Sequence, residues 1–181
     1  AHLTRGDRTA ADTDLAAAHA LVDRLREPAM TWWCMYEHTA VDLLRGRFAE
    51  AEPAIAATAA YGEQHGLAGT AAMAAQFYRL RFDQGRLLEF EDAIAGLVAD
   101  QPEVILWRTG LAAIYTETDR PELARPHVEL IGATDFARVA HGQGRLLTLP
   151  ATGAVAAQTG QLEIAEWGYE RNLPFAGQLC W

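Results

Sequence analysis

Histidine and carboxylate side chains are the groups in this sequence that could perform acid–base or metal chemistry. The six histidines are His2, His19, His38, His65, His127 and His141. No two of them are four residues apart, and the sequence contains no HExxH motif, so they do not form a zinc-binding pair on one helix face. Their spacing predicts neither a metal site nor a cofactor.

Carboxylates gather in three short clusters that could supply the paired acids of a hydrolase. The clusters are Glu50 with Glu52, Glu89 with Glu91 and Asp92, and Glu163 with Glu166. Each lies just after a turn-like residue, where acids stabilise the first turn of a helix. We therefore interpret them as helix-start residues and expect the protein not to be an enzyme.

Two residue types are absent from the chain. All 15 basic residues are arginines, and there is no serine. Without lysine there is no Walker A lysine and no Schiff-base amine, and without serine there is no Ser-His-Asp nucleophile. The motif HGQGR, at 141–145, lacks the third glycine and the preceding strand of a dinucleotide site, so it predicts a loop.

The charge and cysteine content restrict the partners and the compartment. The net charge of −9 opposes binding to nucleic-acid phosphates and to anionic membranes. No apolar run approaches the roughly 20 residues that span a bilayer. Cys34 and Cys180 belong to no CxxC pair, which suits a reducing compartment. We expect a cytoplasmic segment of a longer chain, since there is no signal peptide and no initiator methionine.

A four-fold repeat must position all of these residues. Its copies are RGRFAEAE from 45, QGRLLEFE from 84, TDRPELAR from 118 and TGQLEIAE from 159, and their anchor residues are Gly46, Gly85, Asp119 and Gly160. Residues two, five and nine positions after an anchor lie on one face of a helix. These stripe residues are Phe48, Ala51 and Ile55; Leu87, Phe90 and Ile94; Pro121, Ala124 and Val128; Leu162, Ala165 and Tyr169. Each anchor therefore predicts a turn followed by a helix with a buried stripe.

A second helical stretch precedes each anchor, and no segment alternates like a strand. The pattern predicts an all-α fold of about eight to nine helices, paired antiparallel, in a single domain over 1–181. Its expected parts are a leading helix over 14–27 and hairpins over 29–66, 67–102, 103–135 and 145–175. Pro150 predicts that the first helix of the last hairpin starts near Ala151 or kinks there.

The repeat resembles the tetratricopeptide repeat, in which a turn glycine is followed by an aromatic residue at +2, alanine at +5, a large apolar residue at +9 and proline at +17. Pro102 lies at +17 from Gly85. The stretches LLRGRFAEAE, QFYRLRFDQGRLLEFE, LWRTGLAAIYTETDRPELAR and LPFAGQ are similar to the helical arrays that follow the ATPase module in large actinobacterial LuxR-type transcription regulators and multidomain adenylate cyclases. The resemblance covers about residues 15–179. It implies an α-solenoid for sensing, oligomerisation or autoinhibition in signalling, with no catalytic residue of its own.

The first helices of stacked hairpins line a concave surface, and here they carry aromatic and arginine residues, the commonest interface anchors. Adjacent Trp32 and Trp33 cannot both face one core, so one of them, or Tyr36, should lie at a surface. The predicted binding residues are Trp33 and Tyr115 as apolar anchors, Glu37, Arg79 and Arg108 as charge-selecting groups, and Phe82 beside Arg79. The plainer alternative is that Trp32 and Trp107 are core residues and the others pack between repeats.

Three functions remain open at this point. The leading hypothesis is a non-enzymatic module that binds a protein or peptide partner, or another part of its own chain. The second is a small-molecule sensor, which would need a roomy pocket near Trp33 and Phe82. The third is an enzyme that uses carboxylates with His38 or His141, which would need two titratable groups within hydrogen-bond reach.

Overall fold

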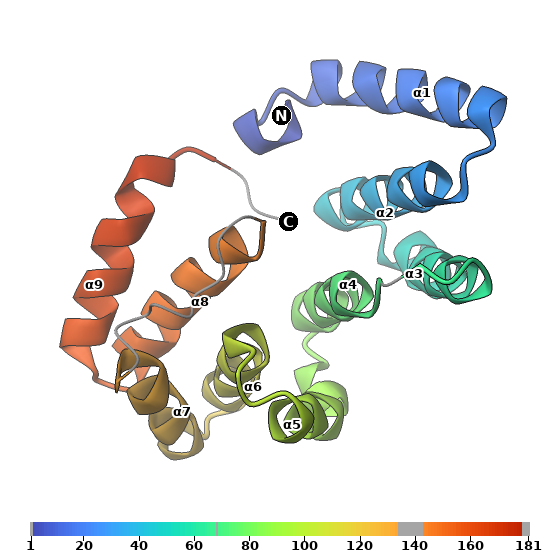
Figure 1. Ribbon diagram of the computed structural model, residues 1–181. Helices are drawn as coiled ribbons and strands as arrows, with labels where there is room; N and C mark the ends of the chain where they lie inside the picture. The colour runs from blue at the N-terminus through green and yellow to red at the C-terminus, as the bar shows by residue number, and fades with distance from the viewer. Residues whose placement is uncertain (1, 68, 134–142, 179–181) are drawn as a thin grey trace. The chain divides into compact units, whose positions relative to one another are not determined.

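The computed structural model describes residues 2–67, 69–133 and 143–178 of the 181-residue chain. Within these ranges it contains nine α-helices and no β-strand (Figure 1), so the predicted all-α fold is confirmed, while solenoid stacking stays a prediction. The helices are α1 (Arg8–Leu25), α2 (Pro28–Leu44), α3 (Phe48–Gln64), α4 (Thr70–Asp83), α5 (Glu91–Asp100), α6 (Ile105–Glu117), α7 (Pro121–Ala133), α8 (Gln143–Gln158) and α9 (Leu162–Asn172), with short 3-10 helices η1 (Leu3–Arg5), η2 (Leu87–Phe90) and η3 (Leu173–Phe175).

The described helices form two compact units. Unit 1 contains α1 to α4 and ends at Gly85, and unit 2 begins at Arg86 and contains η2 and α5 to α9. The boundary falls inside the predicted hairpin over 67–102, because α4 is the first helix of that hairpin and η2 begins the second.

The four anchors adopt the same backbone conformation. Gly46, Gly85, Asp119 and Gly160 have φ angles of 71°, 69°, 57° and 75°. This left-handed region ends a helix and reverses the chain, and it favours glycine because a Cβ is strained there. A new helix begins two residues after every anchor, at Phe48, Leu87, Pro121 and Leu162.

The predicted buried stripe is confirmed at the ninth position after each of the first three anchors, and it is wrong in the fourth repeat. Ile55, Ile94 and Val128, nine residues after their anchors, are all buried. Tyr169 occupies the same position in α9 but is 67% exposed, and Leu162 is 73% exposed. The reason is that α9 has no described helix on that face. Pro121 is also exposed, at the first position of α7.

The core of unit 1 is built around Trp32 of α2, which packs with Ile55 of α3 and Leu80 of α4. Two glycines make room for its indole. A Cβ at Gly62 would lie 2.8 Å from Trp32 Nε1, and one at Gly69 would lie 2.3 Å from Cζ2. Residues smaller than alanine are therefore required where α3 and the α3–α4 connection meet this ring.

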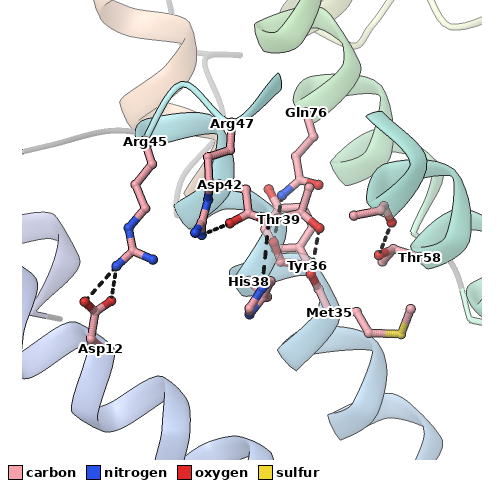
Figure 2. Close-up of polar contacts among 11 residues, drawn as sticks. Asp12, Met35, Tyr36, His38, Thr39, Asp42, Arg45, Arg47, Thr58 and Gln76 are labelled. Carbon is pink, nitrogen blue, oxygen red and sulfur yellow. Dashed lines mark hydrogen bonds and ion pairs between the residues drawn. The ribbon is translucent and has the colours of Figure 1, made fainter. Parts of the chain in front are cut away.

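Polar contacts fix the α2–α3 turn of unit 1, as Figure 2 shows. The Asp42 carboxylate is buried and accepts a hydrogen bond from Arg47, just beyond the turn. Arg45 donates from Nη2 to both carboxylate oxygens of Asp12, at 2.6 and 2.7 Å, which joins the turn to α1. A buried carboxylate needs such a partner because its desolvation is costly.

In unit 2, α6 packs against α5, α7 and α8, and α8 runs beside α9 (Figure 1). The α8–α9 pair approaches at two glycines, since a Cβ on Gly168 would lie only 3.0 Å from the Gly153 Cα. Thr109 and Thr152, both buried, form a hydroxyl–hydroxyl bond of 3.2 Å between α6 and α8. The apolar cluster around Val128 joins α6, α7 and α8.

Two predicted helix boundaries differ from the structure. The leading helix begins at Arg8 instead of near residue 14, because Asp7 caps it by accepting a hydrogen bond from the Ala10 amide. Of the two alternatives for Pro150, a helix start near Ala151 is wrong, because α8 begins at Gln143 and contains Pro150 in its interior, while a kink there stays a prediction. Proline also lies inside α3 and α7, at Pro53 and Pro126.

The three acidic clusters lie at helix starts, and members of the first two pair with arginines. Glu52 accepts from Arg81, and Glu89 accepts from Arg86. Glu91 accepts two bonds from Arg120, at 3.1 and 2.7 Å. Because the chain has no lysine, arginine supplies the permanent positive charge in each of these pairs.

Candidate functional site

The tryptophan pair of α2 is divided between core and surface. Trp32 is 5% exposed and Trp33 is 43% exposed, which confirms that the two neighbours do not share one core. Tyr36 is half-buried and stacks on Trp32, with ring centroids 5.6 Å apart, and the Trp33 ring lies edge-on to both. Trp33 is thus placed as a surface anchor requires, and its binding role stays a prediction.

Glu37 lies half-buried on the same helix. Burial raises the pKa of the neighbouring Cys34 thiol, and the negative charges of Glu37 and Asp23 raise it further. Cys34 is therefore a protonated core thiol rather than a nucleophile. Gln76 of α4 donates to the Tyr36 carbonyl at 2.8 Å, which fastens α4 to this part of α2.

Arg79 and Phe82 lie together on α4, but Arg79 is already neutralised. Its Nε and Nη2 donate to the Asp83 carboxylate at 2.9 and 2.7 Å, and its guanidinium lies 5.3 Å from the Phe82 ring centroid. Both residues are exposed. A guanidinium that is paired with a carboxylate one helical turn away would have to share or release that carboxylate in order to bind a partner.

Arg108 of α6 has no such carboxylate partner among the described residues. It is half-buried, its Nε is buried without a hydrogen-bond acceptor, and its Nη1 lies 3.5 Å from the His127 Nδ1 of α7. Burial lowers the pKa of His127, and the positive charge of Arg108 lowers it further. The imidazole is therefore neutral near pH 7, and the Arg108 charge remains uncompensated.

Tyr115 extends this group along α6. Its ring centroid lies 5.8 Å from that of His127, and the Arg120 guanidinium lies 5.2 Å from the centroid of the same Tyr115 ring. Burial raises the pKa of Tyr115, and the Glu91 charge adds to this effect. Arg120 forms an ion pair with Glu91, so Arg108 is the arginine of this group whose charge has no carboxylate partner among the described residues.

The structure thus places the six predicted residues in two groups, one in each unit. Trp33, Glu37, Arg79 and Phe82 belong to unit 1, and Arg108 and Tyr115 belong to unit 2. His127 was missed by the sequence reasoning. Its separation of 19 residues from Arg108 carries no motif, and only the pairing of α6 with α7 brings the two side chains together.

Three further kinds of site were considered from the sequence: a metal site, an enzyme site that uses His38 or His141, and an aromatic pocket for a small molecule. The described residues contain no group of three metal-ligating side chains. His38 Nε2 lies 3.8 Å from Asp42 Oδ2, beyond hydrogen-bond reach. His141 and Gly142 of HGQGR lie outside the described residues, and the prediction of a loop is wrong for the rest of the motif, because α8 begins at Gln143. The Trp32 indole fills the space at Gly62 and Gly69, and a roomy pocket near Trp33 and Phe82 stays a prediction.

Comparisons with known proteins add no family assignment. No family model, no curated protein and no solved structure matches this chain. In the part of the chain that the structure describes, no helix combines the length and the apolar character needed to cross a bilayer.

Proposed function

We propose that this chain is a non-enzymatic helical interaction module, and that its α6–α7 hairpin binds an acidic segment of a protein or peptide through Arg108. The observation that carries this proposal is the half-buried Arg108 guanidinium, which has only a neutral imidazole beside it. A partly desolvated charge without a counter-charge is unfavourable. A partner carboxylate would remove that cost and form a charge-assisted hydrogen bond.

Tyr115 supplies apolar contact next to this charge, and Arg120 holds that ring from the turn that follows α6. Arg79 contributes less than the sequence pattern suggested, because Asp83 already neutralises it. Trp33 in unit 1 offers a second exposed aromatic surface for the same class of partner.

The wider context of the proposal rests on the resemblance to regulator arrays. In that setting the module is a cytoplasmic, tetratricopeptide-like α-solenoid of a signalling or transcription regulator. Its partner would be another protein or another domain of the same longer chain. The four left-handed anchors, each followed by a helix start, support the repeat character.

The test uses NMR titration of the histidine side chains with acetylated triglutamate amide as the probe. We expect the probe to raise the pKa of His127 in the wild-type chain, because a bound carboxylate offsets the Arg108 charge. In Arg108→Met this response should be lost, and in the matched control Arg79→Met it should persist. Spectra of His127→Gln assign the resonance.

The neutral probe, acetylated triglutamine amide, separates charge from general peptide binding. It should leave the pKa of His127 unchanged. An equal response to both probes, or a response to triglutamate that survives in Arg108→Met, would contradict the proposal.

A further inference from the structure

An apolar groove runs along the α8–α9 hairpin, and no described helix fills it. Its volume is about 850 Å³, and the chain from Leu173 to Gln178 forms part of its wall. The helical residues that matter here are Gly153, Ala154 and Ala157 of α8, and Leu162, Ala165 and Tyr169 of α9. Exposed apolar surface of this kind marks an interaction site more often than a free surface.

The other hairpins show what covers the corresponding surface. α4 packs on α2 and α3, and α8 packs on α6 and α7. As a result Ile55 and Val128, nine residues after their anchors, are 0% and 1% exposed. Tyr169 holds the same place in α9 and is left open. Within its own hairpin, the groove therefore lies at the place where α4 packs on the α2–α3 hairpin and α8 packs on the α6–α7 hairpin.

The lining specifies the chemistry of the missing helix. On the α6–α7 hairpin, α8 presents small apolar side chains, Val155 and Ala156. On the α8–α9 hairpin, Glu166 lies in the wall, and Glu163 and Glu170 are exposed on the same helix. An occupant should carry small apolar residues together with a positive charge.

The outer face of α1 has this chemistry. α1 packs on α2 with Val22 buried, and its opposite face carries Ala17, Ala20, Leu21 and Arg24, all exposed. Their spacing of three to four residues places them on one side of the helix. Leu21 is 45% exposed, so this helix also has apolar surface that no described helix covers.

We propose that α1 of one copy docks in the α8–α9 groove of a second copy, with Arg24 facing Glu166. This contact joins two different surfaces, so a bound pair still offers one free groove on one copy and one free α1 on the other. One helix in one groove is a small interface, so the association is weak and depends on concentration. The contact uses no residue of the proposed Arg108 site, and the two proposals can fail separately.

The experiment is sedimentation velocity of three variants with the same substitution, Ala→Arg, at an exposed alanine. Ala157→Arg blocks the groove, Ala20→Arg blocks the α1 face, and Ala56→Arg on α3 is the control. The wild type and Ala56→Arg should sediment faster as concentration rises. Ala157→Arg and Ala20→Arg alone should stay monomeric, with unchanged circular dichroism and thermal melting.

Mixing the two blocked variants provides the decisive measurement. Ala157→Arg retains α1 and Ala20→Arg retains the groove, so their equimolar mixture should form a 1:1 dimer and nothing larger. Glu166→Arg should weaken wild-type association, and adding Arg24→Glu should restore it. A wild type that stays monomeric, an association that survives either blocking change, or a mixture without dimer would overturn the proposal.

Discussion

Arg79 and Arg108 show how the same side chain can be inert at one position and available at another. Arg79 lies four residues before Asp83 on an exposed helix face, and its charge is satisfied locally. Arg108 lies 3.5 Å from the imidazole of His127, whose pKa is lowered by burial first and by the Arg108 charge second. The neighbour, rather than the residue type, determines which arginine can recognise an anion.

The sequence predicted burial and exposure correctly for residues whose orientation depends on local helix geometry. Consecutive helical positions point about 100° apart, so the separation of buried Trp32 from exposed Trp33 follows from adjacency alone. The contact of Arg108 with His127 could not be predicted in this way, because it depends on the register between α6 and α7. No spacing along the chain encodes that register.

A residue-scale prediction concerns Asp119, which has a left-handed backbone where the other three anchors have glycine. Asp119→Gly should raise the free energy of unfolding by up to about 1 kcal/mol, because the Cβ strain is removed. Gly46→Ala should lower it by about 1 kcal/mol for the opposite reason. Urea denaturation followed by circular dichroism measures both. A loss of stability in Asp119→Gly would show that its side chain outweighs the strain.

At the scale of elements, the turn-and-helix pattern could be predicted because its signals are local. A glycine in the left-handed conformation and an apolar residue at every third or fourth position are both visible in the sequence. The burial of a stripe is different, because it depends on the helix that packs against it. Tyr169 has the stripe position without the covering helix, and the prediction failed there.

The α8–α9 crossing gives an element-scale prediction. Gly168→Ala should lower the free energy of unfolding by about 1–3 kcal/mol, since its Cβ would meet the Gly153 backbone and force the helices apart. The matched control is Gly96→Ala in α5, where no atom lies within 4 Å of the new Cβ. That change should stabilise the protein by about 1 kcal/mol through helix propensity alone. Equal effects of the two changes would mean that the α8–α9 contact is not tightly packed.

At the scale of the whole molecule, two groups with lowered pKa both lie in unit 2. The pKa of His127 lies below its usual value of 6.5 because of burial and Arg108. The pKa of Glu91 lies below its usual value of 4.5 because it accepts hydrogen bonds from Arg120. In both cases the unfolded chain takes up a proton more readily than the folded chain, so acid favours unfolding.

The free energy of unfolding should therefore fall in two stages on acidification. The first begins as the pH drops below 6.5 and ends at the lowered pKa of His127, and the second begins below 4.5 as the stabilisation by ionised Glu91 is lost. Urea denaturation at a series of pH values tests this. His127→Gln should remove the first fall and Glu91→Gln should reduce the second. A first fall that is unchanged in His127→Gln would assign it to another group.

The arginine-only set of ion pairs has a different consequence in alkali. Lysine ammonium groups lose their proton near pH 10.4, so ion pairs that contain them are lost in that range. A guanidinium stays protonated beyond pH 12. The link from Arg120 to Glu91 therefore remains charged in alkaline solution that would discharge the same pair built on a lysine.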